Sequence, residues 1–121
     1  MKTVLVVDDS AFMRNSIIRH LSDCDIRVVG EAENGKIAVE KYIELKPDIV
    51  TLDLAMLDYD GIEALKDIKQ HDPNAMVIVI SSTTDQESVA AEAMALGAHT
   101  IINKPIIKDD LLATFNEIMN T

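Results

Sequence analysis

Residues 4–9 read VLVVDD, a short apolar run that ends in two carboxylates. Two later runs also end in charge: residues 49–53 read IVTLD, and residues 100–105 read TIINKP. Short β-branched runs of this kind predict the buried strands of a parallel sheet. Because parallel strands point the same way, the residues that follow their carboxyl ends gather on one rim of the sheet. The residues expected together at this rim are Asp8, Asp9, Asp53 and Lys104.

Strand and helix patterns alternate along the whole chain, which is typical of a parallel sheet covered by helices on both faces. Apolar residues at helical spacing follow each strand, and Ser10, Asn34 and Asp85 are candidate helix caps. We expect Asp60-Gly61 to start one helix and Gly97 to close another. The predicted fold class is therefore α/β, a doubly wound (βα)5 parallel sheet. The expected strands cover residues 3–7, 26–32, 49–52, 76–80 and 100–103.

Length and composition limit the classes of function. The 121 residues are enough for one domain with a full core, so we expect a single domain over residues 1–121. A formal net charge of −10 argues against a nucleic-acid partner, whose phosphates attract the opposite charge. The single cysteine rules out a disulfide within the chain, and neither a signal-peptide pattern nor a membrane span is evident. We therefore expect a cytoplasmic protein that does not enter a membrane.

Carboxylates gathered at one rim repel one another, by roughly 4 kcal/mol per pair at 4 Å and an effective dielectric near 20. Lys104 supplies one positive charge, and Mg²⁺ is the natural second source because it takes hard oxygen ligands and keeps several waters. If two carboxylates hold the metal, the third can attack phosphorus as a nucleophile and form an aspartyl phosphate. Ser81 and Ser82, just after a predicted strand, offer a hydroxyl for the phosphoryl oxygens.

Each of these residues, taken singly, has an ordinary structural explanation. Asp9 or Ser10 suits the cap of the first helix, and Asp53 suits a turn at the end of a strand. A lone lysine such as Lys104 is more often a solvated surface residue than a ligand. The joint pattern on four different strands is what favours a phosphoryl-transfer site.

The chain resembles, over its whole length, the receiver domain of bacterial response regulators, and especially CheY-like stand-alone receivers. Residues 6–9 are similar to the acidic pair that binds metal in this family. Leu52-Asp53, with Met56 and Asp60-Gly61 downstream, is similar to the phosphorylation strand and its loop, and Lys104-Pro105 to the lysine motif. The resemblance implies a flavodoxin-like fold with strand order 2-1-3-4-5, and often a cis bond before the proline of the lysine motif.

The same resemblance implies a role for each site residue. Asp53 is then the phosphoacceptor, Ser81 the switch hydroxyl, and Lys104 the partner of the phosphoryl group. In phosphoryl transfer the protein mostly positions the groups and stabilises charge, so a metal, a lysine and a hydroxyl are sufficient. The implied Mg²⁺ ligands are Asp8, Asp9, Asp53 and the backbone carbonyl of Ala55.

The implied function is that of a response regulator in two-component signal transduction, and more narrowly a chemotaxis regulator. A sensor histidine kinase or a phosphotransfer protein would donate the phosphoryl group from a phospho-histidine. A downstream protein would bind the face formed by the predicted fourth helix, last strand and last helix, near residues 85–96, 100–103 and 111–118. Such a domain is a phosphoacceptor, with self-catalysed phosphotransfer and autodephosphorylation as its only reactions, and is not otherwise an enzyme.

Departures from the family pattern carry predictions of their own. Leu57 stands where the family has a proline, and Ile101 stands where it has an aromatic switch residue. We therefore expect the signal to depend on Ser81 and the loop after it, not on a rotating ring. Ala55 and Thr83 occupy the positions that tune phosphate hydrolysis, and neither carries a charge that could orient water. This predicts slower autodephosphorylation than in relatives with an acid or amide there.

The sequence is also compatible with other functions. A phosphorelay carrier and a receiver domain cut from a longer response regulator, such as the chemotaxis methylesterase, fit the same residues. An aspartate-nucleophile phosphatase needs a second carboxylate two residues after the nucleophile, where this chain has Ala55. A flavodoxin-like cofactor binder needs a Ser/Thr/Gly-rich loop after the first strand, where Asp8-Asp9 would repel phosphate. An interaction domain with an inactive site also remains, and only a demonstration of phosphorylation would exclude it.

Overall fold

A computed structural model describes residues 1–56, 61–82 and 87–120 of the chain. Strands and helices alternate through these residues, as the sequence predicts. The strands are β1 (Lys2–Val7), β2 (Ile26–Ala32), β3 (Ile49–Asp53), β4 (Met76–Ser81) and β5 (Thr100–Asn103), and the helices are α1 (Ala11–His20), α2 (Gly35–Leu45), α3 (Gly61–His71), α4 (Glu87–Ala95) and α5 (Lys108–Met119).

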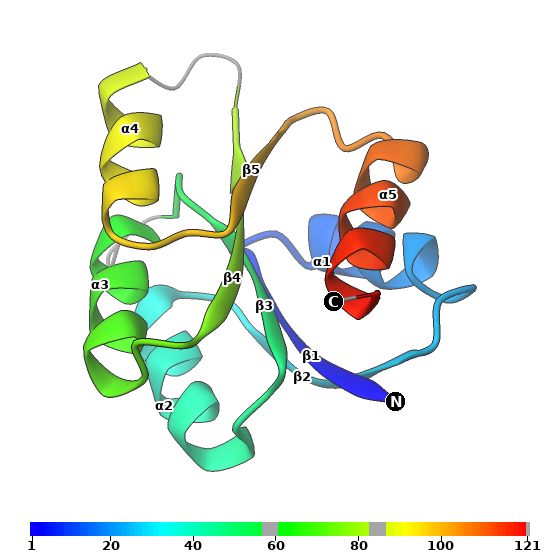
Figure 1. The fold of residues 1–121 in the computed structure, drawn as a ribbon, viewed down its shortest axis with the longest axis horizontal. Helices are drawn as coiled ribbons and strands as arrows, with labels where there is room; N and C mark the ends of the chain where they lie inside the picture. Colours follow the sequence, from blue (N-terminus) through cyan, green and yellow to red (C-terminus); the bar gives the residue numbers. More distant parts are fainter. Residues whose placement is uncertain (57–60, 83–86, 121) are drawn as a thin grey trace.

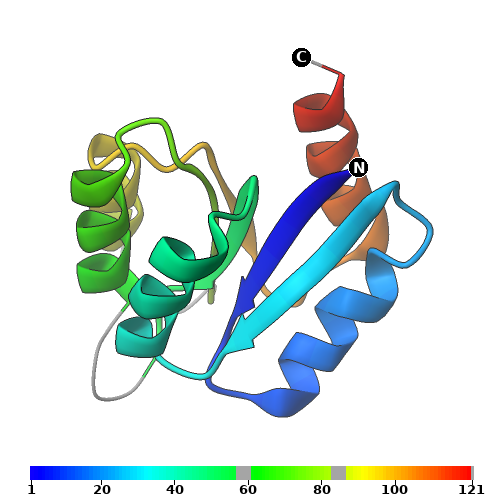
Figure 2. The same ribbon diagram turned by 90° about the horizontal axis from the view of Figure 1, so that it is seen from below.

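The strands of the described residues form one parallel sheet in the order β2-β1-β3-β4-β5. Helices α1 and α5 cover one face of this sheet, and α2, α3 and α4 cover the other (Figures 1 and 2). The α/β (βα)5 class and the strand order implied by the resemblance are both confirmed. The predicted central position of β3 is also confirmed, because every residue of β3 is buried.

Two apolar layers hold the sheet between its helices. Leu5 and Val7 of β1 pack into the layer shared with α2, α3 and α4, whereas Val4 and Val6 pack into the layer shared with α1 and α5. This division follows from the strand itself, since successive side chains point to opposite faces. With both faces covered, the carboxyl ends of the strands are fixed relative to one another at a single rim.

The predicted helix ends are confirmed where the structure describes them. The Ser10 hydroxyl accepts a hydrogen bond from the backbone of α1, and the Asn34 side chain accepts one from the backbone of α2. Gly97 follows α4 with φ of 105°, a left-handed conformation that suits glycine. Asp60 and Asp85, the two other predicted start residues, lie outside the described residues. No helix in the described part of the chain has the length and apolarity needed to cross a membrane.

Strands β3 and β4 each continue one residue further than the sequence predicts. Asp53 and Ser81, expected just beyond the strands, are the last residues of β3 and β4. The ladder continues through them, because Asp53 pairs with Ile80 and Ser81 pairs with Asn103. Both residues are therefore held in place by the sheet.

Candidate functional site

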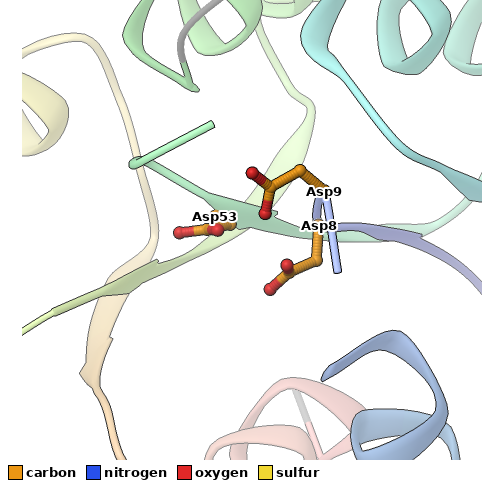
Figure 3. Close-up of side chains that lie close together, drawn as sticks. All are labelled: Asp8, Asp9 and Asp53. Atoms are coloured by element: carbon orange, nitrogen blue, oxygen red, sulfur yellow. The ribbon is translucent and has the colours of Figure 1, made fainter. Parts of the chain in front are cut away.

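The predicted acidic residues meet at the carboxyl rim. Asp8 and Asp9 follow β1 directly, and Asp53 ends the neighbouring strand β3. One carboxylate oxygen from each of the three lies within 4.8 Å of the others. Figure 3 shows the three side chains close together, with Asp8 and Asp9 just after β1 and Asp53 at the end of β3. The gathering that the strand-end pattern predicts is therefore present.

Asp53 is buried, with both carboxylate oxygens engaged. Its side chain is 2% exposed, and Oδ1 accepts a hydrogen bond of 3.1 Å from the backbone N–H of Ala55. Oδ2 lies 3.3 Å from Nζ of Lys104. The turn after Asp53 is held as well, because the Leu54 N–H donates to the carbonyl of Ile80 at 3.0 Å. Asp53 thus sits between a backbone donor and an ammonium group.

Asp8 is the most deeply buried acid of the site. Its Oδ1 accepts a hydrogen bond of 2.9 Å from the Ser10 N–H. Its Oδ2 is buried without a hydrogen bond from the described residues, and lies 3.8 Å from Nζ of Lys104. Burial, together with the smaller effect of the nearby Asp53 charge, raises the pKa of Asp8 to about 6 against the lowering effect of the Ser10 hydrogen bond.

Lys104 brings the only ammonium group that the described residues place in ion-pair contact with Asp8 and Asp53. It follows β5, and its backbone N–H donates to the carbonyl of Ser81 at 2.7 Å. The bond to Pro105 is cis, as the resemblance implies. One ammonium cannot balance three carboxylates, so the rim keeps a negative charge.

The donor set fits a magnesium ion. All of the ligand atoms are carboxylate oxygens, which are the hard donors that Mg²⁺ prefers. Oδ2 of Asp8 is buried and lacks a hydrogen bond from the described residues, a costly state that a cation would relieve. Asp9 is exposed, which leaves room for the waters that Mg²⁺ keeps.

The remaining predicted residues take different positions. Ser81 lies at the rim, buried to 3% exposure, and its hydroxyl donates to the Ser82 carbonyl at 3.3 Å. Ala55 is exposed two residues beyond Asp53. Ile101 lies in β5 and packs against the layer of α2, α3 and α4. Thr83 and Leu57 lie outside the described residues.

Sequence reasoning missed one residue that contacts the acidic turn. Nη1 of Arg14, on α1, donates to the backbone carbonyl of Asp8 at 2.7 Å. Its Nε pairs with Oε1 of Glu31 at 3.0 Å. The available signal was its position one helical turn after Ser10, which places its side chain over the start of the helix.

The chain matches the family described as "Response regulator receiver domain" over residues 4–116. It is 44% identical over 117 residues to "Chemotaxis protein CheY" of Thermotoga maritima, with 97% of each chain covered. The solved response regulator domain of Thermotoga maritima CheB has a TM-score of 0.89 and 42% identity, covering 100% of this chain and 98% of that one. A solved CheX-CheY-BeF3-Mg complex from Borrelia burgdorferi gives a TM-score of 0.91 and 33% identity, with coverages of 98% and 89%.

Proposed function

The chain belongs to the response regulator receiver family and is of the CheY chemotaxis type, and we propose that it carries its signal as a phosphoryl group on Asp53. A carboxylate oxygen of Asp53 attacks the phosphorus of a phospho-histidine. The P–N bond breaks, and the donor imidazole keeps the electron pair and takes up a proton. The observation that carries this proposal is the buried Asp53 carboxylate, 3.3 Å from the Lys104 ammonium and beside two further acids.

The other residues of the rim would stabilise the developing charge. Lys104 would neutralise one phosphoryl oxygen, and the Ser81 hydroxyl, which donates to the Ser82 carbonyl in the structure, would donate to another. Mg²⁺, when bound, supplies further positive charge at the phosphoryl oxygens. Its ligands would be the carboxylates of Asp8, Asp9 and Asp53 and the backbone carbonyl of Ala55, the set implied by the resemblance.

The donor would be a sensor histidine kinase or a phosphotransfer protein, and small phosphodonors would use the same rim. We place the protein in the cytoplasm as a single receiver domain over residues 1–121, without an enzymatic reaction beyond its own phosphorylation and dephosphorylation. The solved Borrelia burgdorferi complex combines a CheY with CheX, BeF3 and Mg²⁺. This likeness supports Mg²⁺ and a protein partner for the present chain.

The output would pass to the face of α4, β5 and α5. A cavity of about 440 Å³ lies beside Lys104 on this face and includes Ile101, Ile107 and Thr114 among its lining residues. Ile107, just before α5, and Met94, on α4, are exposed apolar side chains. Because the Lys104 N–H donates a hydrogen bond to the Ser81 carbonyl, a shift of either residue toward the phosphoryl group would also displace the end of β5.

This output route predicts a spectroscopic change. NMR signals of residues 84–103 should shift when the chain is phosphorylated, because the equilibrium between two arrangements of this region moves. NMR signals of β2 and α2 should change little and serve as the internal control. Matching spectra of residues 84–103 in the two states would contradict the proposed route.

Intact mass tests the proposed phosphorylation directly. The chain is incubated with acetyl phosphate and Mg²⁺, beside the variant Asp53→Ala and a sample containing EDTA. Of these three samples, we expect only the wild type with Mg²⁺ to gain one phosphoryl mass, since both the carboxylate and the metal are needed. The variant Asp109→Asn, which removes an exposed acid on α5, should label like the wild type. A wild type that binds Mg²⁺ and gains no mass would contradict the proposal.

A further inference from the structure

Arg14 joins three elements through one guanidinium group. Nη1 donates to the Asp8 carbonyl at 2.7 Å, and Nε pairs with Oε1 of Glu31 at 3.0 Å. The side chain is mostly covered, with 17% of it exposed. Because the guanidinium is planar and has donors in a fixed fork, fixing one end of it orients the other. Arg14 therefore connects α1, the turn after β1 and the end of β2.

Hydrogen bonds engage the polar atoms of Asp8, the Arg14 contact among them, except for the carboxylate oxygen Oδ2. The Asp8 N–H donates to the Ala32 carbonyl at 3.0 Å, and Oδ1 accepts from the Ser10 N–H at 2.9 Å. The Asp8 carbonyl accepts from Arg14. Oδ2 remains, buried and without a hydrogen bond from the described residues, and it is the atom that lies 3.8 Å from Lys104.

The carbonyl that Arg14 holds belongs to the peptide group between Asp8 and Asp9. A peptide group is planar, so fixing its oxygen also fixes the direction in which Asp9 leaves the turn. Both acids then reach the rim with a defined relative orientation. Glu31 is itself anchored, since it pairs with Val6 in the sheet and its carbonyl accepts a hydrogen bond from Lys41.

We propose that Arg14 is a positioning residue that aligns the Asp8 and Asp9 carboxylates for Mg²⁺ without touching the ion. This inference rests on the proposed function of the rim as a metal-assisted phosphorylation site. The change in Mg²⁺ affinity expected on removing Arg14 has the opposite sign from a simple charge effect. Removing a cation near an acidic site strengthens Mg²⁺ binding by Coulomb attraction, whereas removing a positioning contact weakens it.

The test is the affinity for magnesium chloride, measured by isothermal titration calorimetry on the unphosphorylated full chain. The variants are Arg14→Ala, Arg14→Lys and the matched control Arg19→Ala, which removes the same charge from an exposed position on the same helix. We expect Arg14→Ala to weaken Mg²⁺ binding roughly ten-fold, as loss of a contact that orients a ligand does in other metal sites. Arg14→Lys should be intermediate, because an ammonium can reach only one of the two acceptors at a time.

The outcomes separate cleanly. Binding by Arg14→Ala that is as tight as in the wild type, or tighter, overturns the inference. If circular dichroism shows that Arg14→Ala does not fold, Arg14→Lys decides, because it keeps the charge of the wild type: weaker Mg²⁺ binding than in the wild type supports the inference, and equal binding overturns it.

A metal-free readout distinguishes this inference from the proposed function. A wild type that binds no Mg²⁺ would contradict the proposed function of the rim. The amide of Ser10 then reports on positioning alone, because its N–H donates to Oδ1 of Asp8. Its hydrogen exchange should be faster in Arg14→Lys and Arg14→Ala than in Arg19→Ala. Equal exchange in all of them would overturn the positioning role.

Discussion

Carboxylates lie at both ends of the sheet, but their surroundings differ. At the amino ends of the strands, Asp48 accepts hydrogen bonds from the Thr3 N–H at 2.8 Å and the Thr3 hydroxyl at 3.2 Å. Asp72 accepts from the Tyr42 hydroxyl at 2.8 Å. At the carboxyl rim, Asp8 is 1% exposed, and its Oδ2 has no hydrogen bond from the described residues.

The pKa values of these acids move in opposite directions. Hydrogen bonds from Thr3 lower the pKa of Asp48, and the Tyr42 hydroxyl lowers the pKa of Asp72. Burial instead raises the pKa of Asp8 to about 6. The hydrogen bonds at the amino end therefore favour the ionised forms of Asp48 and Asp72, whereas burial at the rim disfavours the ionised form of Asp8. The buried charge of Asp8 would therefore be stabilised when a cation binds at the rim.

Neutralising Asp8 should remove most of this difference. The variant Asp8→Asn keeps an oxygen for the Ser10 N–H and removes a buried charge. Since the pKa of Asp8 is higher in the folded chain than in the unfolded one, its contribution to stability is present at acidic pH and is lost as pH rises through about 6. We expect metal-free Asp8→Asn to unfold with a free energy higher than that of the wild type by roughly 1 to 3 kcal/mol at pH 7.5.

Urea unfolding in EDTA and in Mg²⁺ measures this effect. Adding Mg²⁺ should stabilise the wild type and leave Asp8→Asn nearly unchanged, because binding to the folded state alone raises its stability. Asp109→Asn, at an exposed position, is the matched control for removing a negative charge. If metal-free Asp8→Asn is less stable than the wild type, the buried charge of Asp8 does not destabilise the fold, and the contrast with the acids at the amino end is wrong.

The charged residues of the rim could be predicted from the sequence, although β3 and β4 each continue one residue further than expected. Asp53 and Lys104 close apolar runs, and a parallel sheet brings such ends together. The sequence does not distinguish Asp8 from Asp9, yet one is buried and the other exposed. That difference depends on the path of the chain after β1. The Arg14 contact was missed for a similar reason, since its acceptors are a main-chain carbonyl and a residue on another strand.

A second prediction sharpens the comparison by testing water at the rim. Ala55 is exposed beside Asp53 and has no group that could orient a water molecule. The variant Ala55→Asn should shorten the lifetime of the phosphorylated chain by up to about ten-fold, a barrier lower by ~1.4 kcal/mol. Decay of the phosphoryl mass after acetyl phosphate is removed measures this lifetime. Ala91→Asn, at an exposed position on α4, is the control, and equal decay in all three chains would contradict the prediction.

A third prediction concerns a buried polar group below the rim. Thr51, in β3, is fully buried, and its hydroxyl has no hydrogen-bond partner among the described residues. Thr51→Val keeps the shape and removes the unsatisfied group, so we expect a stability gain of about 1 kcal/mol. Thr51→Ser keeps the hydroxyl and loses a methyl, and it should destabilise the chain. A loss of stability in Thr51→Val, measured by urea unfolding, would show that the hydroxyl is satisfied.

The smallest effect is expected at the amino end. Tyr42→Phe keeps the aromatic ring and removes the hydrogen bond to Asp72. Because that bond lowers the pKa of Asp72 below its unfolded value, the stability it contributes is present above about pH 4 and is lost as pH falls through the folded pKa. The urea midpoint of Tyr42→Phe should therefore lie below that of the wild type at pH 7, and the gap should narrow near pH 3. Phosphoryl uptake should stay unchanged, since Tyr42, on α2, lies near Asp48 and Met76 at the amino ends of β3 and β4. A gap of the same size at both pH values, or an altered uptake, would show that the two ends are not independent.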